Sequence, residues 1–156
     1  WNTPLTSLLF VILSIAGGAL LAVQIPIALA LLIGAGIIQV AYWIWGDQAF
    51  YNSETNMASA TGLGDQGSVR AFEPPHTGTN YLLREFVHIV GRKHAAKLRI
   101  IALILMIGTP VLILSIDVNI ILILIAILVH TAGLLVSRWL FFAQAEHVVG
   151  LYYGKR

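Results

Sequence analysis

Four long apolar runs without a single charged side chain constrain this chain more than any other feature. They extend from about Leu5 to Val23, Ile25 to Trp45, Ile100 to Ile116 and Ile120 to Ser137. A helix needs about 20 apolar residues to cross the hydrocarbon core of a bilayer. Helices of a water-soluble bundle would each need a polar face, and these runs have none. The sequence therefore predicts an all-α integral membrane protein with four transmembrane helices.

The composition supports the same fold class. Only 10% of the 156 residues are charged and 58% are hydrophobic, whereas ordinary soluble domains are about 25% charged. The chain contains no cysteine, which excludes disulfides and thiolate ligands to zinc or an iron–sulfur cluster from this chain. The sequence starts at Trp1 without an initiator methionine, and we expect it to be a piece of a longer polypeptide.

The connections between the runs predict two antiparallel hairpins. Gln24–Pro26 and Asp117–Asn119 are tight turns, and a long loop separates the two pairs. We divide the chain into a first transmembrane hairpin (1–45), an extramembrane loop (46–98), and a second hairpin with a C-terminal tail (99–156). All nine Lys and Arg residues lie on the loop side or at its membrane boundary, and the opposite side has only Asp117. The positive-inside rule then places the loop and the C-terminus in the cytoplasm.

The long loop has two different halves. Residues 52–67 are rich in Ser, Thr, Asn and Gly, and we expect them to be irregular. Gly62–Gly67 matches G-x-G-x-x-G, but no buried strand precedes it and Pro74-Pro75 follows soon after, so its glycines are expected to form turns rather than a nucleotide site. After Thr79 or Asn80, apolar residues recur at helical spacing, which predicts an amphipathic helix at the membrane surface: Leu83, Phe86, Val87 and Val90.

A basic cluster immediately precedes the third run. Such a cluster can bind anionic lipid headgroups or an acidic partner surface, and a collar that only fixes topology is the alternative. The cluster and four polar residues of the loop are our candidate contacts to a partner or to lipid: Glu73, His76, Arg84, Glu85, Arg92, Lys93, Lys97 and Arg99. No catalytic residue or metal ligand is predicted.

The histidines bear on whether this chain binds heme. A b-type heme held by two histidines needs them at matching depth on facing helices, and only His130 lies deep inside a run. His147 comes 17 residues later, which is about 25 Å along a continuous helix. We therefore expect no heme here. His130 either faces a cavity or partner, as ionisable groups at membrane depth often do, or bonds to a backbone carbonyl, which we favour.

The loop also carries a resemblance to a known family. The segments 73–85 (EPPHTGTNYLLRE) and 91–99 (GRKHAAKLR) resemble the membrane-anchor subunits of dimethyl sulfoxide reductase-type enzymes, and Trp1–Pro4, Ser59–Gly64 and Ser137–Phe142 look like the same family. The resemblance implies an eight-span anchor without heme, of which this chain would be the C-terminal half. Such an anchor holds a molybdopterin catalytic subunit and an iron–sulfur subunit at the membrane and oxidises menaquinol.

The resemblance also limits what can be assigned. The family's quinol site is associated with the N-terminal half, so no quinol-site residue is carried over and this fragment is expected to bind no cofactor itself. The expected partners are the two redox subunits, the missing half and the bilayer of the bacterial inner membrane, with no nucleic acid. Half of a transporter or channel is the alternative, with Gln39, His130 and the Gly108-Thr109-Pro110 break as its deep candidates.

Overall fold

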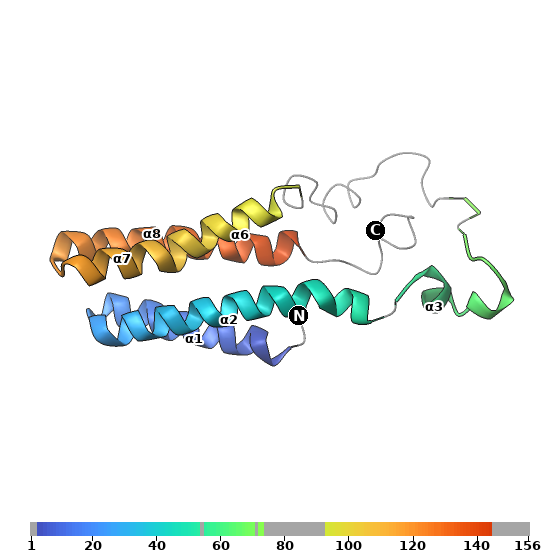
Figure 1. The fold of residues 1–156 in the computed structure, drawn as a ribbon, viewed down its shortest axis with the longest axis horizontal. Helices are drawn as coiled ribbons and strands as arrows, with labels where there is room; N and C mark the ends of the chain where they lie inside the picture. The colour runs from blue at the N-terminus through green and yellow to red at the C-terminus, as the bar shows by residue number, and fades with distance from the viewer. Residues whose placement is uncertain (1–2, 54, 71, 74–92, 145–156) are drawn as a thin grey trace.

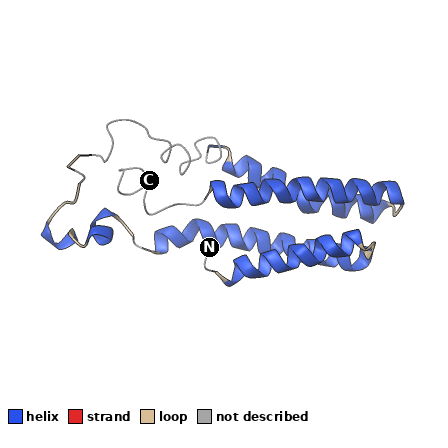
Figure 2. Ribbon diagram, turned by 180° about the vertical axis from the view of Figure 1, so that it is seen from behind, coloured by secondary structure: helices blue, strands red, loops and turns tan. Residues whose placement is uncertain are grey.

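Four long helices lie side by side as two hairpins in a computed structural model of the chain (Figure 1). The structure describes residues 3–53, 55–70, 72–73 and 93–144. The elements are α1 (Pro4–Leu21), α2 (Ile25–Asn52), α3 (Met57–Thr61), η1 (Gly64–Gln66), α6 (Ala95–Leu103), the π-helix η2 (Ile104–Gly108), α7 (Thr109–Ile116) and α8 (Ile120–Ala143). Within the described ranges there are helices and loops but no strand (Figure 2). The prediction of an all-α fold is confirmed.

The surface of the helices indicates a multi-pass membrane protein. Four helical segments are long and apolar enough to cross a bilayer: α1, Ile25–Ala49 of α2, the continuous α6–η2–α7, and α8. Their outward faces carry large apolar side chains, with Ile37, Leu128 and Leu135 each 66–69% exposed. Contiguous apolar surface of this extent is unstable in water. The bilayer is therefore the solvent of these faces.

The two tight turns are stabilised locally. At the end of α1 the Gln24 N–H donates to Ala19 O (2.9 Å) and the Val23 N–H donates to Leu20 O (3.1 Å), the paired bonds of a Schellman motif. Val23 holds the left-handed position (φ 57°) that glycine usually takes. In the second turn Asn119 Oδ1 accepts from the Leu122 N–H (3.0 Å) and so caps α8. Both predicted hairpins are thus present.

The helices differ from the predicted runs mainly at the loop side. α2 continues to Asn52 rather than ending near Trp45, α6 begins at Ala95 rather than near Ile100, and α8 runs to Ala143 rather than Ser137. Hydropathy falls where the chain leaves the hydrocarbon core, but the backbone pattern continues because no proline intervenes. Hydropathy therefore locates the membrane, and the helices extend beyond it.

The first half of the loop contains more structure than its composition predicts. Residues 52–67 are not irregular throughout, because Met57–Thr61 forms the short helix α3. Its start is a capping box, in which Asn56 Oδ1 accepts from the Ser59 N–H (2.8 Å) and Ser59 Oγ accepts from the Asn56 N–H (2.9 Å). Gly62 then ends α3 with φ 68°. The predicted amphipathic helix after Asn80 lies outside the described residues.

The core of the bundle is a set of small and branched apolar side chains. α1 packs along α2, and α6, η2 and α7 pack along α8, while the hairpins meet through α1 with α8 and through α2 with η2 and α7. The fully buried members include Ala16, Leu20, Ala28, Leu32, Ala35, Met106 and Ala126. Small residues in such positions let membrane helices approach closely. The described polar contacts of the spans are few, and they define the candidate site.

Candidate functional site

The third span is interrupted by a π-helix at mid-membrane depth. The Thr109 N–H donates to Ile104 O, five residues earlier, so this turn holds one more residue than an α-helical turn. The next residue, Pro110, is buried and has no N–H. In a regular α-helix residue 110 would donate to the carbonyl of Met106. The sequence therefore leaves the Met106 carbonyl without its usual donor.

His130 of α8 supplies that donor. Its Nδ1 lies 2.6 Å from Met106 O, and because a carbonyl can only accept, the proton is assigned to Nδ1. The side chain is only 4% exposed. Its Nε2 has no hydrogen-bond partner among the described residues and faces α1, where a Cβ on Gly17 would lie 3.7 Å away. The prediction that His130 bonds to a backbone carbonyl is confirmed.

Gly133 brings the two backbones together at the same place. It lies one turn after His130 on the same side of α8, and a Cβ built on it would overlap the backbone nitrogen of Met106 and lie 2.7 Å from Leu105 C and from Met106 Cα. The obstacle is main chain rather than a flexible side chain. Glycine is therefore required at this point of α8 for the close approach of the π-helix.

A second buried polar contact links the two hairpins. The Ser137 hydroxyl donates to Gln39 Oε1 over 3.2 Å, and the side chains are 5% and 2% exposed. Gln39 lies on α2 and Ser137 on α8. An amide buried in an apolar bundle needs such a partner because an unsatisfied polar group is costly there. The contact fixes the register of α2 against α8.

At the loop-side end of the bundle, Arg99 of α6 ties α2 and α8 together. Its guanidinium forms a bidentate pair with Asp47 (2.6 and 2.7 Å), and its Nε and a terminal nitrogen donate to Gln144 Oε1 (3.1 and 2.9 Å). Its Cζ also lies 5.5 Å from the centre of the Trp43 ring. The planar fork of arginine suits this arrangement and an ammonium group would not.

A second cation lies close to aromatic rings at this end. Arg138 Cζ lies 3.9 Å from the centre of the Phe10 ring. Phe141 contacts Phe10 edge-on (5.9 Å between centroids, 84°) and stacks on Tyr42 (6.3 Å, 23°). The cluster joins α1, α2 and α8. Cation–π contacts gain strength where water is scarce, which suits a membrane boundary.

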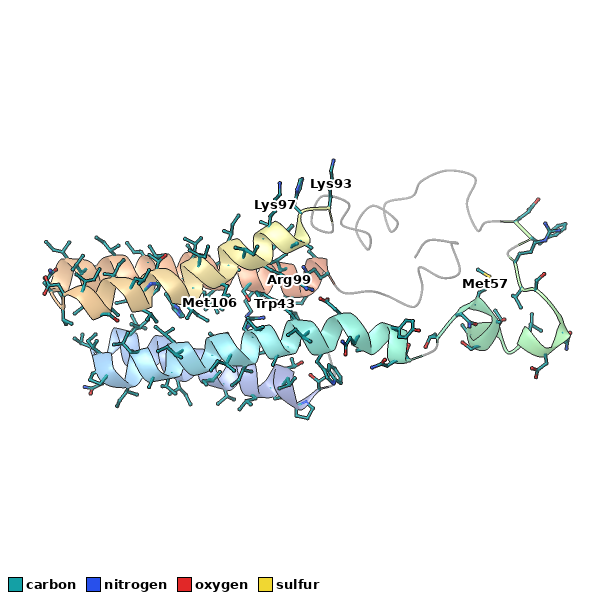
Figure 3. The ribbon with its side chains drawn as sticks, viewed as in Figure 1. Trp43, Met57, Lys93, Lys97, Arg99 and Met106 are labelled. Atoms are coloured by element: carbon teal, nitrogen blue, oxygen red, sulfur yellow. The ribbon has the colours of Figure 1, made fainter. Side chains whose placement is uncertain are left out.

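The structure divides the predicted basic cluster. The sequence predicts that Arg99 faces lipid or a partner, but its charge is paired with Asp47 inside the bundle and its side chain is 23% exposed. Lys93 and Lys97 are exposed (Figure 3), as is Glu73. His76, Arg84, Glu85 and Arg92 lie outside the described residues, so their role stays a prediction. Sequence reasoning misses Asp47 and Gln144 because they are 52 and 45 residues from Arg99.

Two further sequence predictions concern the loop and metals. In the G-x-G-x-x-G match, Gly62 and Gly67 have φ of 68° and 135°, so these glycines form turns as predicted. A short 3₁₀ turn, Gly64–Gln66, lies between them. Within the residues that the structure covers, no group of three or more His, Cys, Asp or Glu side chains is placed to hold a metal ion.

Comparison with known proteins gives one relative over nearly the whole chain. A subunit of the sulfite dehydrogenase of Allochromatium vinosum is 30% identical over 172 aligned residues, which cover 98% of this chain and 51% of that protein. The chain is similar to a redox-enzyme subunit. It spans about half the length of that relative. No protein-family model matches the chain, and no solved structure matches it.

Proposed function

We propose that this chain is part of the membrane anchor of a redox enzyme complex in the bacterial inner membrane. The observation that carries the proposal is the extent of the similarity to the sulfite dehydrogenase subunit, because 98% of the chain includes all four spans and the loop. The resemblance of residues 73–85 and 91–99 to dimethyl sulfoxide reductase anchors supports the same role. Both comparisons lead to a subunit that serves an enzyme.

The partners follow from that role. We propose an iron–sulfur subunit and a molybdopterin catalytic subunit, held at the side of the membrane from which the long loop and the helix ends emerge. The contacts of Arg99 with Asp47 and of Ser137 with Gln39 support a firm platform on that side, because they bond helices of different hairpins. The exposed Glu73, Lys93 and Lys97 offer charges to a docking surface.

The anchor would exchange electrons between the menaquinone pool and the iron–sulfur subunit. The two resemblances differ in direction. An anchor of the dimethyl sulfoxide reductase type oxidises menaquinol, whereas a sulfite dehydrogenase releases two electrons and two protons as sulfite and water become sulfate, and these would reduce the quinone. The direction therefore depends on the catalytic subunit, and the anchor's role is the same in both cases.

Co-purification from native membranes tests the proposal. The full-length protein, tagged at its C-terminus and solubilised in a mild detergent, should bring down two larger proteins together with iron and molybdenum at a fixed ratio to the anchor. A multi-pass protein of similar abundance, tagged in the same way, controls for carry-over. Recovery of the tagged protein without iron or molybdenum would contradict the proposal and favour half of a transporter or channel.

The same preparation decides the direction of electron flow. Reduction of a menaquinone analogue on addition of sulfite indicates a dehydrogenase, and oxidation of the reduced analogue by dimethyl sulfoxide indicates a reductase. Crosslinkers placed at Glu73, His76, Arg84 and Glu85 should reach one of the partner subunits or the other half of the anchor. Crosslinks found only from the Gln24 and Asp117 turns would place the partners on the opposite side.

A further inference from the structure

An apolar groove of about 540 Å³ lies between α2 and the third span. Its walls run from Val40 and Leu103 near the loop side to Ile33 and Val111 deeper in the membrane, with Gly36 and Gly108 among the lining residues. Its volume is within the usual range of about 300–1,000 Å³ for ligand sites. Every lining side chain is apolar, so the groove fits a hydrocarbon chain and offers no partner for a polar head.

The wall of this groove continues toward the loop into two free cations. Lys97 precedes the lining residue Ile104 by seven residues, and Lys93 precedes Lys97 by four. Residues at these spacings share one face of a helix. Both lysines are exposed, and Figure 3 shows them pointing away from the bundle at the start of α6. One face of the third span therefore carries positive charge first and apolar groove next.

The depths of the two features match the length of an amphiphile. Leu103, at the loop-side end of the groove, comes six residues after Lys97, which is about 9 Å along the helix. Lysine stems extend toward the headgroup layer and hold their ammonium groups there. Between the two features lies Ile100, 61% exposed. A headgroup at the lysines would thus place its first methylenes beside Ile100 and its chain in the groove.

The charges at the mouth of the groove select the kind of amphiphile. Arg99 is neutralised by Asp47 and turned toward Trp43 between the hairpins (Figure 3), so Lys93 and Lys97 carry the free positive charge described here. We propose that the groove and these two lysines bind an anionic phospholipid, with its phosphate at the lysines and one acyl chain in the groove. A neutral quinol would gain nothing from the two charges.

Native mass spectrometry of the full-length protein tests this proposal. The protein is delipidated and incubated with phosphatidylglycerol or phosphatidylcholine of identical chains. Each lysine near anionic lipid contributes about a fivefold preference, so the wild type should retain phosphatidylglycerol about 25-fold better than phosphatidylcholine. Lys93→Gln/Lys97→Gln should reduce phosphatidylglycerol to the level of phosphatidylcholine. Arg70→Gln, which removes an exposed charge of the loop, is the matched control and should change nothing.

A groove variant separates chain binding from headgroup binding. A Cβ at Gly108 meets only Leu103 O at 4.0 Å, so Gly108→Leu fits and fills the groove, and both lipids should be lost. Gly18→Leu is its control, because no atom lies within 4 Å of a Cβ there. Equal retention of the two lipids by the wild type overturns the proposal. So does unchanged phosphatidylglycerol binding in either the double lysine variant or a Gly108→Leu protein whose thermal unfolding is normal.

Discussion

Gly133→Ala tests whether the π-helix and α8 touch through their backbones. The added Cβ would overlap the main-chain nitrogen of Met106 and lie 2.7 Å from two further backbone atoms, whereas ordinary contact begins at 3.4 Å. The two helices must therefore separate by at least about 0.7 Å. Neighbouring side chains cannot absorb this shift, because the obstacle is the main chain of the adjacent helix.

The expected cost follows from two effects. Inserting a methyl group into a well-packed core usually costs about 1–3 kcal/mol, and an obstacle of main-chain atoms favours the upper end of that range. The separation also stretches the bond from His130 to Met106 O, and hydrogen bonds between membrane helices contribute about 0.6 kcal/mol on average. We expect a loss of about 3 kcal/mol, or more than a hundredfold in the folding equilibrium.

Thermal unfolding of the detergent-solubilised protein, followed by tryptophan fluorescence, measures the loss. Gly18→Ala is the matched control, because a Cβ there meets nothing within 4 Å. Alanine is a better helix former than glycine by about 0.5–1 kcal/mol, so the control should be neutral or slightly more stable. The two substitutions thus differ in sign. A Gly133→Ala protein as stable as Gly18→Ala would show that α8 and η2 are not in backbone contact, which would refute the requirement for glycine at position 133.

Three other outcomes follow from the same structure. His130→Phe keeps a ring but removes the donor, so it should destabilise by about 1 kcal/mol; the loss should shrink in a Pro110→Ala background, where an N–H becomes available to Met106 O, and equal losses in both would refute the role given to the proline. In a double-mutant cycle Arg99→Lys and Asp47→Asn should couple by no more than about 1 kcal/mol, since this pair is partly exposed, and high salt should weaken the coupling; a coupling unaffected by salt would contradict that exposure. A reporter fused at Asn56 should be active only in its cytoplasmic form, and periplasmic activity would reverse the orientation drawn from the nine basic residues.

The membrane architecture is predictable because it depends on composition and length alone. Each run is apolar on all sides, and neither the number of crossings nor the pairing into hairpins needs any contact between distant residues. The helix ends are less predictable, because polar residues such as Asp47 continue a helix that has already left the hydrocarbon core. Asn56 and Ser59 carry a readable capping signal that composition conceals.

The contacts of the site depend on information that sequence spacing does not contain. His130 and the Gly108-Thr109-Pro110 break are both visible as deep features, but nothing in the sequence shows that one supplies the donor missing from the other. Arg99 is grouped with its basic neighbours in the sequence because adjacency along the chain suggests a common role. The fold separates them, since successive residues of a helix point in different directions.

The described polar contacts are unevenly distributed along the bundle, and this favours a supporting role over transport. Those that bond one hairpin to the other lie toward the loop side: Gln39 with Ser137, Asp47 with Arg99, and the Phe10 ring with Arg138. Toward the turns, the core is apolar, with Leu20, Ile25, Leu114 and Ile123. Alternating access requires one half of a bundle to rock against the other, and bonds across the hairpins at the loop side oppose that motion. They instead fix the four helix ends from which the loop and the tail emerge, which is the geometry that a docking platform for a catalytic subunit requires.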